Sequence, residues 1–323
     1  MLDRATFLEN RRRGVGGSDI AAILGLSPWK TPYDVYLDKR GEAEEEDPDK
    51  PALYWGTVLE DVVATEYAKR TGNRVQRVNK LLVHPEAPYA VANIDRAVVN
   101  PEIAGNVRWK DGRLTTDKVL ECKTANGFAA HMWGDAGTDE VPDYYLLQCA
   151  WYMGITGAET ADLAVLIGGQ DYRTYTIERD QELIDDLLDE AGRFWERVEK
   201  GIAPDPQSVE DAQRRWPRHL AGKNLIVDTD IAEACARLAR ISTERKALEA
   251  EEKEIKATVM AEMGDAEEIT HAGQKLATWK HQVARRVDTK ALKAERPDIA
   301  EEFTTETESR VFRLSPAAKE MAE

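Results

Sequence analysis

The chain has few cysteines, and their spacing excludes a cysteine-ligated centre. Of its 323 residues only Cys122, Cys149 and Cys235 are cysteines, and no two of them form a C-x-x-C pair. Clustered cysteines are the sequence mark of zinc and iron–sulfur sites. We therefore expect neither kind of site, and we expect a protein of the reducing cytoplasm.

The chain also lacks a long apolar run. No stretch approaches the roughly 20 apolar residues that a helix needs to cross a bilayer, and residues 1–13 are polar. We therefore expect neither a membrane segment nor a signal peptide. Wholesale disorder is not expected, because 42% of the residues are hydrophobic and eight are tryptophans. A chain of this length can form one large domain or two smaller ones.

An excess of positive charge is missing as well. The formal net charge is −16, which argues against diffuse binding to DNA, because phosphate binding is mainly electrostatic. Net charge says little about one groove, however. Acidic residues cluster at 42–49 and 242–268, and basic residues cluster at 11–13 and 280–293. A basic channel in an otherwise acidic protein remains compatible with this pattern.

The stretch that organises the chain surrounds Glu121. It is typical of a short buried strand, on which Glu121 and Lys123 point to the same face. A second acid, Asp95, lies in the strand-like run 90–99, and residues 100–118 suit a hairpin connection. Antiparallel pairing would put Asp95 beside Glu121, with Lys123 at the rim of this pair of acids. Such a group can hold a divalent metal and a water for phosphodiester hydrolysis, although an exposed strand edge with a salt bridge explains Glu121 and Lys123 equally well.

The elements around this stretch predict an α/β (α+β) fold. Helices are expected at residues 20–25, 33–40, 51–71, 142–154 and 181–200, and further strands at 78–84, 159–168 and 172–178. This order predicts a mixed sheet flanked by helices. Residues 126–141 are expected to form a loop beside the site. Gln148, in the apolar helix 142–154, needs a hydrogen-bond partner.

Two further polar groups could serve a site. Ser18 is the expected N-cap of the helix at residues 20–25, and with the arginines at 11–13 it could bind an anion, although a simple cap explains it too. Glu60 stands at the edge of the apolar stripe of helix 51–71, so it could face a cleft or simply water. The predicted stripe consists of Trp55, Leu59, Val62, Val63 and Tyr67.

A break at residues 204–206, Pro-Asp-Pro, divides the chain into an expected domain at 1–208 and a second part at 209–323. The second part contains a long charged helix at 231–263 whose apolar spacing is similar to a coiled-coil seam. Strand-like ends at 269–281, a helix start at 287–293 and a strand at 309–314 follow. No catalytic group is evident there, so a role in assembly or partner contact is predicted. Packing of the helix on its own first domain is the alternative.

Six ordered motifs in residues 11–205 carry a family resemblance. They are Arg-x-x-Gly-Val-Gly-Gly-Ser-Asp at 11–19, Leu-Gly-Leu-Ser-Pro-Trp-Lys-Thr-Pro-Tyr at 24–33, Trp-Gly-x-x-x-Glu at 55–60, Asp95, Glu-Cys-Lys at 121–123, and Gln148 before Cys-Ala-Trp-Tyr. With these motifs the chain resembles the YqaJ-like viral recombinase family, the phage exonucleases of the lambda exonuclease type, within the restriction-endonuclease-like superfamily. The connection between Asp95 and Glu121 is longer than a minimal member needs.

The resemblance implies a role for each matching residue. Asp95 and Glu121 would ligate metal together with the backbone carbonyl of Cys122, and Glu60 would join them directly or through water. Lys123, with a pKa lowered near the metal, would orient or help deprotonate the attacking water. The remaining implied roles are positioning of the water or of Lys123 by Gln148, and binding of a 5′-phosphate by Ser18 and Arg11, with Arg12 and Arg13 as equally basic alternatives.

The resemblance also implies an activity and partners. The expected enzyme is a Mg²⁺-dependent double-strand DNA 5′→3′ exonuclease that makes 3′ single-strand tails for recombination by two-metal hydrolysis, with Mn²⁺ as a substitute ion. It would act on DNA ends as a homo-oligomeric ring such as a trimer, hand the tail to a single-strand annealing protein, and work in the cytoplasm of a bacterial host from a phage or prophage gene. The alternatives are an endonuclease or helicase-coupled nuclease with the same core, or a non-catalytic protein that binds DNA ends or a partner.

Overall fold

The computed structural model describes residues 11–43 and 50–322. The chain divides into two compact units between Arg215 and Trp216, whereas the predicted domains meet between residues 208 and 209. Within the described ranges, no helix is both long and apolar enough to cross a membrane.

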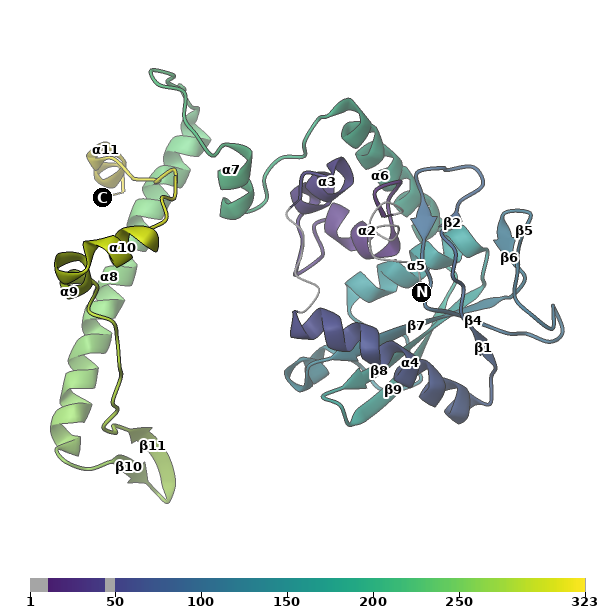
Figure 1. Ribbon diagram of the computed structural model, residues 1–323, viewed down its shortest axis with the longest axis horizontal. Helices are drawn as coiled ribbons and strands as arrows, with labels where there is room; N and C mark the ends of the chain where they lie inside the picture. The colour runs from purple at the N-terminus through teal and green to yellow at the C-terminus, as the bar shows by residue number, and fades with distance from the viewer. Residues whose placement is uncertain (1–10, 44–49, 323) are drawn as a thin grey trace. The chain divides into compact units, whose positions relative to one another are not determined.

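The first unit is built on a five-stranded sheet with the order β1-β4-β7-β8-β9 (Figure 1). Its strands are β1 (Val75–Gln76), β4 (Arg96–Val98), β7 (Lys118–Ala125), β8 (Thr160–Ile167) and β9 (Asp171–Glu178). The central strand β7 pairs antiparallel with β4 and parallel with β8. The mixed sheet expected from the order of elements is therefore confirmed.

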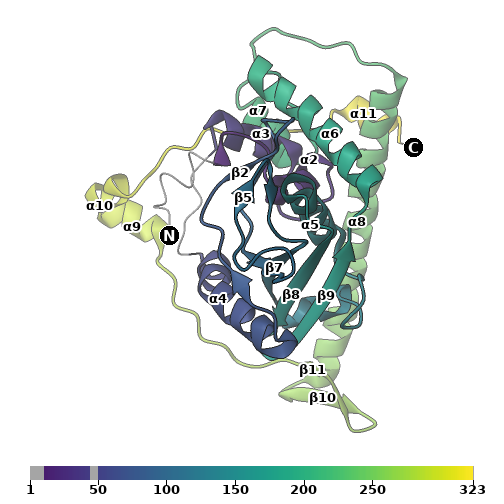
Figure 2. The ribbon, with the colours of Figure 1, turned by 90° about the vertical axis from the view of Figure 1, so that its right-hand side faces the viewer.

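Helices cover both faces of this sheet (Figure 2). The bounds of the first unit's helices are α2 (Gly17–Ile23), α3 (Pro32–Arg40), α4 (Pro51–Thr71), the 3-10 helix η1 (Gly127–Met132), α5 (Asp143–Thr156), α6 (Gln181–Lys200) and α7 (Val209–Arg215). Leu120 and Cys122 of β7 pack with α4 in a small core, whereas Val119 belongs to the large core with α5, α2 and α6. Since side chains alternate along a strand, Glu121 and Lys123 belong to the face that α5 covers.

The predicted helix ends of α3 and α6 are confirmed by their caps. The side chain of Thr31 accepts the backbone N–H of Asp34 at 3.2 Å, with Pro32 in the first turn. Asp180 caps α6 in the same way, and α6 ends at Gly201 with a φ of 69°. A side-chain acceptor at the start and a left-handed residue at the end satisfy the unpaired groups of a helix.

The two strands expected before residue 100 are each broken. Residues 78–84 contribute only β2 (Leu82–Val83), and 90–99 divides into β3 (Val91–Ala92) and β4. β3 pairs with β2, whereas β4 pairs with β1 and β7. Because the chain changes partners between these strands, it bends there, and Asp95 stands in the bend directly before β4.

The start of α2 also differs from the prediction. Gly16 is the N-cap, and the carboxylate of Asp19 accepts its backbone N–H at 2.9 Å. Ser18 lies in the first turn and is exposed. A side chain at the third helical position can accept the N–H of the N-cap residue, so Asp19 fixes the start of the helix one residue before Ser18.

Helix α4 has the predicted bounds but buries a narrower stripe. Val63, Ala64 and Tyr67 are buried against the sheet, whereas Trp55 is 54% and Val62 53% exposed. Because the contact of α4 with the sheet is mostly with β7 and β8, only one narrow side of the helix is covered.

The connection between β4 and β7 joins two antiparallel strands, as expected, and it contains a small hairpin of its own. It is formed by β5 (Trp109–Lys110) and β6 (Arg113–Leu114). The turn residues Asp111 and Gly112 both have positive φ, 51° and 76°, which is the conformation that tight two-residue hairpins favour.

The second unit contains the expected long helix, α8 (Thr229–Met263), capped by Asp228. Its other elements are the hairpin of β10 (Glu268–His271) and β11 (Gln274–Thr278), and the short helices α9 (Thr289–Glu295), α10 (Pro297–Glu302) and α11 (Pro316–Glu320). The predicted strand at 309–314 is wrong, because the segment is described and has no strand partner. Its apolar residues Val311 and Phe312 are 66% and 73% exposed.

Candidate active site

Asp95 and Glu121 lie side by side, as the strand pairing predicted. The register pairs Arg96 with Leu120, so one step further along the ladder Asp95 stands opposite Glu121. The carboxylate oxygen Oδ2 of Asp95 accepts a hydrogen bond of 2.8 Å from the backbone N–H of Cys122. This bond holds the bend before β4 against the strand that carries Glu121.

The carboxylate of Glu121 is buried and only half satisfied. The residue is 3% exposed, and its oxygen Oε1 accepts hydrogen bonds from Gln148 Nε2 at 2.7 Å and Lys123 Nζ at 2.5 Å. Its other oxygen, Oε2, is buried without any hydrogen-bond partner. An unpaired buried carboxylate oxygen is costly, so this atom indicates a ligand that the protein alone does not supply.

The electrostatics of Asp95 point the same way. Burial raises the pKa of Asp95 well above its ordinary value, and the negative charge of Glu121 raises it further. Two neighbouring carboxylates that disfavour each other's charge are stabilised by a bound cation.

The donor set fits a hard divalent ion. In an extended strand, the N–H and C=O of one residue point toward the same neighbouring strand. The carbonyl of Cys122 therefore faces the same side of β7 as its N–H, which bonds to Asp95. Burial raises the pKa of the Cys122 thiol, and its side chain packs on the α4 side of the sheet. The available donors are therefore oxygens, which Mg²⁺ and Mn²⁺ prefer.

Glu60 takes a different partner in the structure. Its carboxylate accepts a hydrogen bond of 2.6 Å from Arg96, whose side chain is almost fully buried and also donates to the carbonyl of Asp95 at 2.5 Å. Within the described ranges, no three acidic, histidine or cysteine side chains converge as a metal site would need. We call Asp95 and Glu121 the acidic cluster. Glu60 would reach a metal at this acidic cluster only by giving up its hydrogen bond with Arg96.

Arg96 is a site residue that sequence reasoning missed. It pairs with Leu120 and therefore points to the α4 face, where Glu60 and Asp61 receive its guanidinium. The signal was present in the sequence. An arginine directly after a strand acid must point to the opposite face, and a buried guanidinium there needs acids from the helix above it.

Lys123 is held between a carboxylate and a ring. Its ammonium group lies 2.5 Å from Glu121 Oε1 and 4.9 Å from the centre of the Tyr145 ring. Burial by itself would lower the pKa of Lys123, but the charges of Glu121 and Asp95 raise it above its ordinary value. The lowered pKa expected from the sequence was tied to a bound metal and stays a prediction. The protein's own charges thus keep Lys123 protonated, as a donor that can orient an oxygen.

Gln148 has the partners that its burial required. Its side-chain nitrogen donates to Glu121 and to the hydroxyl group of Tyr152, at 2.8 Å for the latter. The N-terminal end of α2 closes over this pair. A β-carbon on Gly17 would lie 2.5 Å from the ring of Tyr152 and 3.1 Å from Gln148 Cγ, so only glycine permits this approach.

The residues expected at a 5′-phosphate lie along the same segment. Arg11 is half-buried and pairs with Asp38 at 2.9 Å and Asp19 at 3.4 Å. Arg12 and Arg13 are exposed. Ser18 is exposed and directly follows Gly17, which closely approaches Gln148. The charge of Arg11 is therefore partly neutralised by acids of its own chain.

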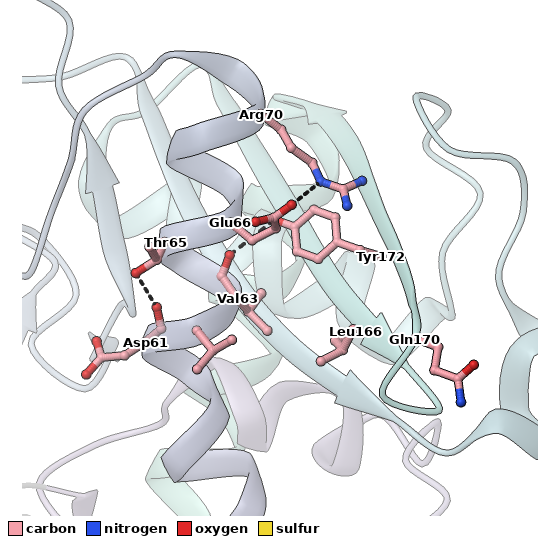
Figure 3. A pocket seen from close by; sticks show the side chains of 9 residues that line it. Asp61, Val63, Thr65, Glu66, Arg70, Leu166, Gln170 and Tyr172 are labelled. Carbon is pink, nitrogen blue, oxygen red and sulfur yellow. Dashed lines mark hydrogen bonds and ion pairs between the residues drawn. The ribbon is translucent and has the colours of Figure 1, made fainter.

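A separate hollow lies over α4 (Figure 3). It has a volume of about 490 Å³ and is lined by residues of α4 and of the β8–β9 hairpin, among them Glu66, Arg70, Leu166 and Tyr172. Arg70 pairs with Glu66 at 2.7 Å and lies over the ring of Tyr172. Neither Asp95 nor Glu121 lines this hollow, so it is distinct from the acidic cluster.

Comparison with known proteins gives a consistent match. The model of the YqaJ-like viral recombinase domain matches residues 6–159. The protein named "Uncharacterized protein YqaJ" from Bacillus subtilis (strain 168) is 35% identical over 318 residues, which cover 96% of this chain and 94% of the relative.

Two solved structures are similar at lower identity. An alkaline exonuclease (LHK-Exo) from Laribacter hongkongensis has 19% identity and a TM-score of 0.47, over 65% of this chain and 97% of that chain. A phage related exonuclease from Haemophilus somnus 129PT has 13% identity and a TM-score of 0.41, over 61% and 99%. Family membership rests on the sequence matches and not on these structural likenesses.

Proposed function

The chain belongs to the family of YqaJ-like viral recombinases, and from this membership and the acidic cluster we propose that it is a metal-dependent exonuclease of double-strand DNA. In this proposal it degrades a DNA end in the 5′→3′ direction and leaves a 3′ single-strand tail for recombination. The observation that carries the proposal is the buried, unpartnered oxygen Oε2 of Glu121 beside the carboxylate of Asp95.

The proposed ion is Mg²⁺, with Mn²⁺ as a substitute. Asp95, Glu121 and the carbonyl of Cys122 would hold it. When bound, such an ion supplies a Lewis acid for the phosphoryl oxygens and makes a water more acidic. A second ion would need further oxygen donors beside Asp95 and Glu121. Because Glu60 is paired with Arg96, Asp95 and Glu121 are the two carboxylates that can bind an ion without breaking an ion pair with an arginine.

The other side chains would orient the reacting groups. Gln148 and Lys123 both donate to Glu121 Oε1, which leaves Oε2 without a partner as the proposed ligand atom. Lys123, kept protonated, would donate to a phosphate or water oxygen and offset the charge that gathers there. Arg96 would hold the backbone of Asp95 through its carbonyl, so that its carboxylate keeps one position.

The 5′-phosphate of the DNA end is proposed to bind at the start of α2. Exposed Ser18 borders Gln148 through Gly17, and the arginines at residues 11–13 are near in the chain. A phosphate there would compete with Asp19 and Asp38 for Arg11. Arg12 and Arg13 stay alternatives of equal basicity. Linear duplex with a 5′-hydroxyl should therefore be digested more slowly than duplex with a 5′-phosphate. Ser18→Ala should reduce that difference.

The full activity is proposed to involve partners. These are the DNA end itself, further copies of this chain in a ring such as a trimer, and a single-strand annealing protein that receives the tail in the cytoplasm of a bacterial host. A ring would allow an acidic outer surface to coexist with a basic channel.

The deciding experiment is digestion of linear duplex DNA labelled at one 5′ or one 3′ end. With Mg²⁺, we expect label release from the 5′ end first, no release with EDTA, and no release by Glu121→Gln. Conversion of supercoiled plasmid would instead indicate an endonuclease. Binding of DNA ends without any cleavage by the native protein would indicate a non-catalytic end-binding protein.

A further inference from the structure

An exposed tryptophan next to the cluster has no role in the chemistry proposed above. Trp29 belongs to the Leu-Ser-Pro-Trp-Lys turn between α2 and α3, and it is 65% exposed. The turn is ordered by Ser27, whose hydroxyl oxygen accepts the backbone N–H groups of Trp29 at 3.2 Å and Lys30 at 3.3 Å. The indole is thus presented to solvent by a built turn.

Ring contacts lead from Trp29 to the cluster. The ring of Trp29 meets Tyr144 edge-on at a centroid distance of 4.7 Å, and it lies 6.2 Å from Tyr145. Tyr144 and Tyr145 contact each other at 4.5 Å, and Lys123 lies over the ring of Tyr145. One ring therefore separates the exposed indole from the ammonium group of Lys123.

The inner end of this aromatic series is rigid. Tyr145 packs on Trp133 at 5.4 Å, and Trp133 packs on Tyr175 at 5.6 Å. Trp133 and Tyr175 are buried, and the hydroxyl group of Tyr175 donates to the carbonyl of Gly134 at 2.8 Å. Offset and edge-on ring pairs add stability beyond area burial. The outer rings are therefore held in place from within, while Trp29 remains open.

We propose that Trp29, backed by Tyr144, is a stacking platform for one nucleobase of the DNA strand whose phosphate lies at the acidic cluster. This inference rests on the proposed nuclease function and adds a base-binding position to it. Aromatic faces bind bases without regard to sequence, which suits an enzyme that proceeds along DNA. The platform lies beside Lys123, so the stacked base and the reacting phosphate would belong to nearby nucleotides.

The test measures binding in EDTA, so that no cleavage takes place. The probe is a fluorescent duplex with a 5′-phosphate and a 3′ overhang, measured by anisotropy with the full-length protein. Trp29→Ala should weaken binding by about 5- to 150-fold, the range expected for loss of one stacked base. Trp29→Phe should retain most of the affinity, whereas Trp29→Leu should not, because leucine keeps apolar bulk but has no π-face.

A change in the DNA identifies the contact directly. A series of probes carries one abasic nucleotide at successive positions near the 5′ end. One position should weaken binding by the native protein as much as Trp29→Ala does, and should have no further effect on that variant, because both changes remove the same contact. Additive effects at every position would overturn the proposal, as would equal binding by Trp29→Leu and Trp29→Phe.

A matched control is available on α4. Trp55 is also exposed and also meets a tyrosine edge-on, Tyr54 at 5.3 Å, but α4 lies on the other face of the sheet. Trp55→Ala should leave binding unchanged, and an equal loss in both variants would overturn the assignment to Trp29. A smaller oligomer of Trp29→Ala in light scattering would make Trp29 a subunit contact and would also overturn it. Binding that depends on Trp29 in a protein that never cleaves DNA would refute only the nuclease proposal.

Discussion

The side chain of Asp95 is fastened to the backbone of Cys122 by a 2.8 Å hydrogen bond. The acid that precedes β4 is thereby fixed to the strand that carries the second acid. The spacing between the two carboxylates is thus set by the pairing of β4 with the central strand β7 and does not depend on a mobile loop. Preorganised carboxylates of this kind are what the proposed metal-dependent reaction requires.

The first prediction concerns the two acids. Asp95→Asn and Glu121→Gln should each lower Mg²⁺-dependent digestion by more than about 100-fold, beyond the typical cost of losing a residue that only supports a ligand. Mg²⁺ should raise the thermal unfolding midpoint of the native protein, because a ligand of the folded state stabilises it. It should not raise that of the variants.

The same variants carry a stability control. The pKa of Asp95 is raised in the folded state. The folded protein is therefore destabilised by ionisation of Asp95 as the pH rises above the pKa that this group has in the unfolded chain. Without metal, Asp95→Asn should therefore be no less stable than the native protein at neutral pH. Near-native digestion by either folded variant would contradict the site.

The second prediction separates Lys123 from a structural lysine on the same strand. Lys123→Met should lose most turnover yet still bind DNA ends, since it removes the protonated donor beside Glu121. Lys118→Met is the control, because Lys118 pairs with Asp162 at 3.1 Å on the α4 face and should keep its turnover. Equal turnover rates for the two variants would mean that Lys123 only forms a salt bridge with Glu121.

The third prediction concerns the buried pair of Lys39 and Asp19. Their charged groups are 2.6 Å apart, and the side chains are 0% and 1% exposed. Lys39→Met should cost about 3–5 kcal/mol of unfolding free energy, because it leaves a buried carboxylate with weaker compensation. Removal of the exposed pair partner in Arg40→Ala should cost at most about 1 kcal/mol.

This pair also predicts a pH dependence. Burial by itself would raise the pKa of Asp19, but Lys39 and Arg11 lower it below its ordinary value. The ionised Asp19 therefore stabilises the folded protein fully at pH values above the pKa of this group in the unfolded chain. This stabilisation is lost as the pH falls through the pKa of Asp19 in the folded protein. In Lys39→Met the acid-unfolding midpoint should move to higher pH. Circular dichroism across acid pH measures it, and an unchanged midpoint would contradict the role of the pair.

The fourth prediction concerns the second unit. We propose that it serves assembly or partner contact, and that a chain ending at Arg215 remains a folded nuclease whose oligomer size or partner binding is altered. A chain ending at Ser208 should be less stable by about 1–3 kcal/mol. It lacks α7, whose fully buried Asp211 accepts from Thr31 at 3.0 Å and from the backbone of Gln207 at 3.1 Å. Light scattering and urea unfolding of both chains test this, and an insoluble chain ending at Arg215 would show that the units fold together.

The pairing of Asp95 with Glu121 could be predicted because it needs only two local rules. Side chains alternate along β7, and a hairpin connection implies antiparallel pairing. The partner of Gln148 was predicted only in kind, as a buried group that must be satisfied. Its identity depends on the docking of α5 against β7, which brings it to Glu121, and no local pattern encodes that contact.

Other features depend on competition between parts of the chain. Ser18 has the chemistry of a cap, but the helix begins before it, with Gly16 as the N-cap and the carboxylate of Asp19 accepting the N–H of Gly16. Trp55 and Val62 have the spacing of a buried stripe, but the sheet covers too little of α4 to bury them. Residues 309–314 have strand character without a neighbouring strand to pair with. In each case the local preference is present and the tertiary surroundings decide.

The parallel pairing of β7 with β8 has a kinetic consequence. Parallel strands cannot be joined by a tight turn, so the segment that contains α5 must cross over before β8 can close beside β7. That same crossover delivers Gln148 to Glu121. The crossover is thus tied to the proposed ion site. Until the crossover closes, Glu121 lacks its donor from α5, and a partly folded chain would hold a cation poorly. We therefore expect Mg²⁺ to slow unfolding far more than it accelerates folding.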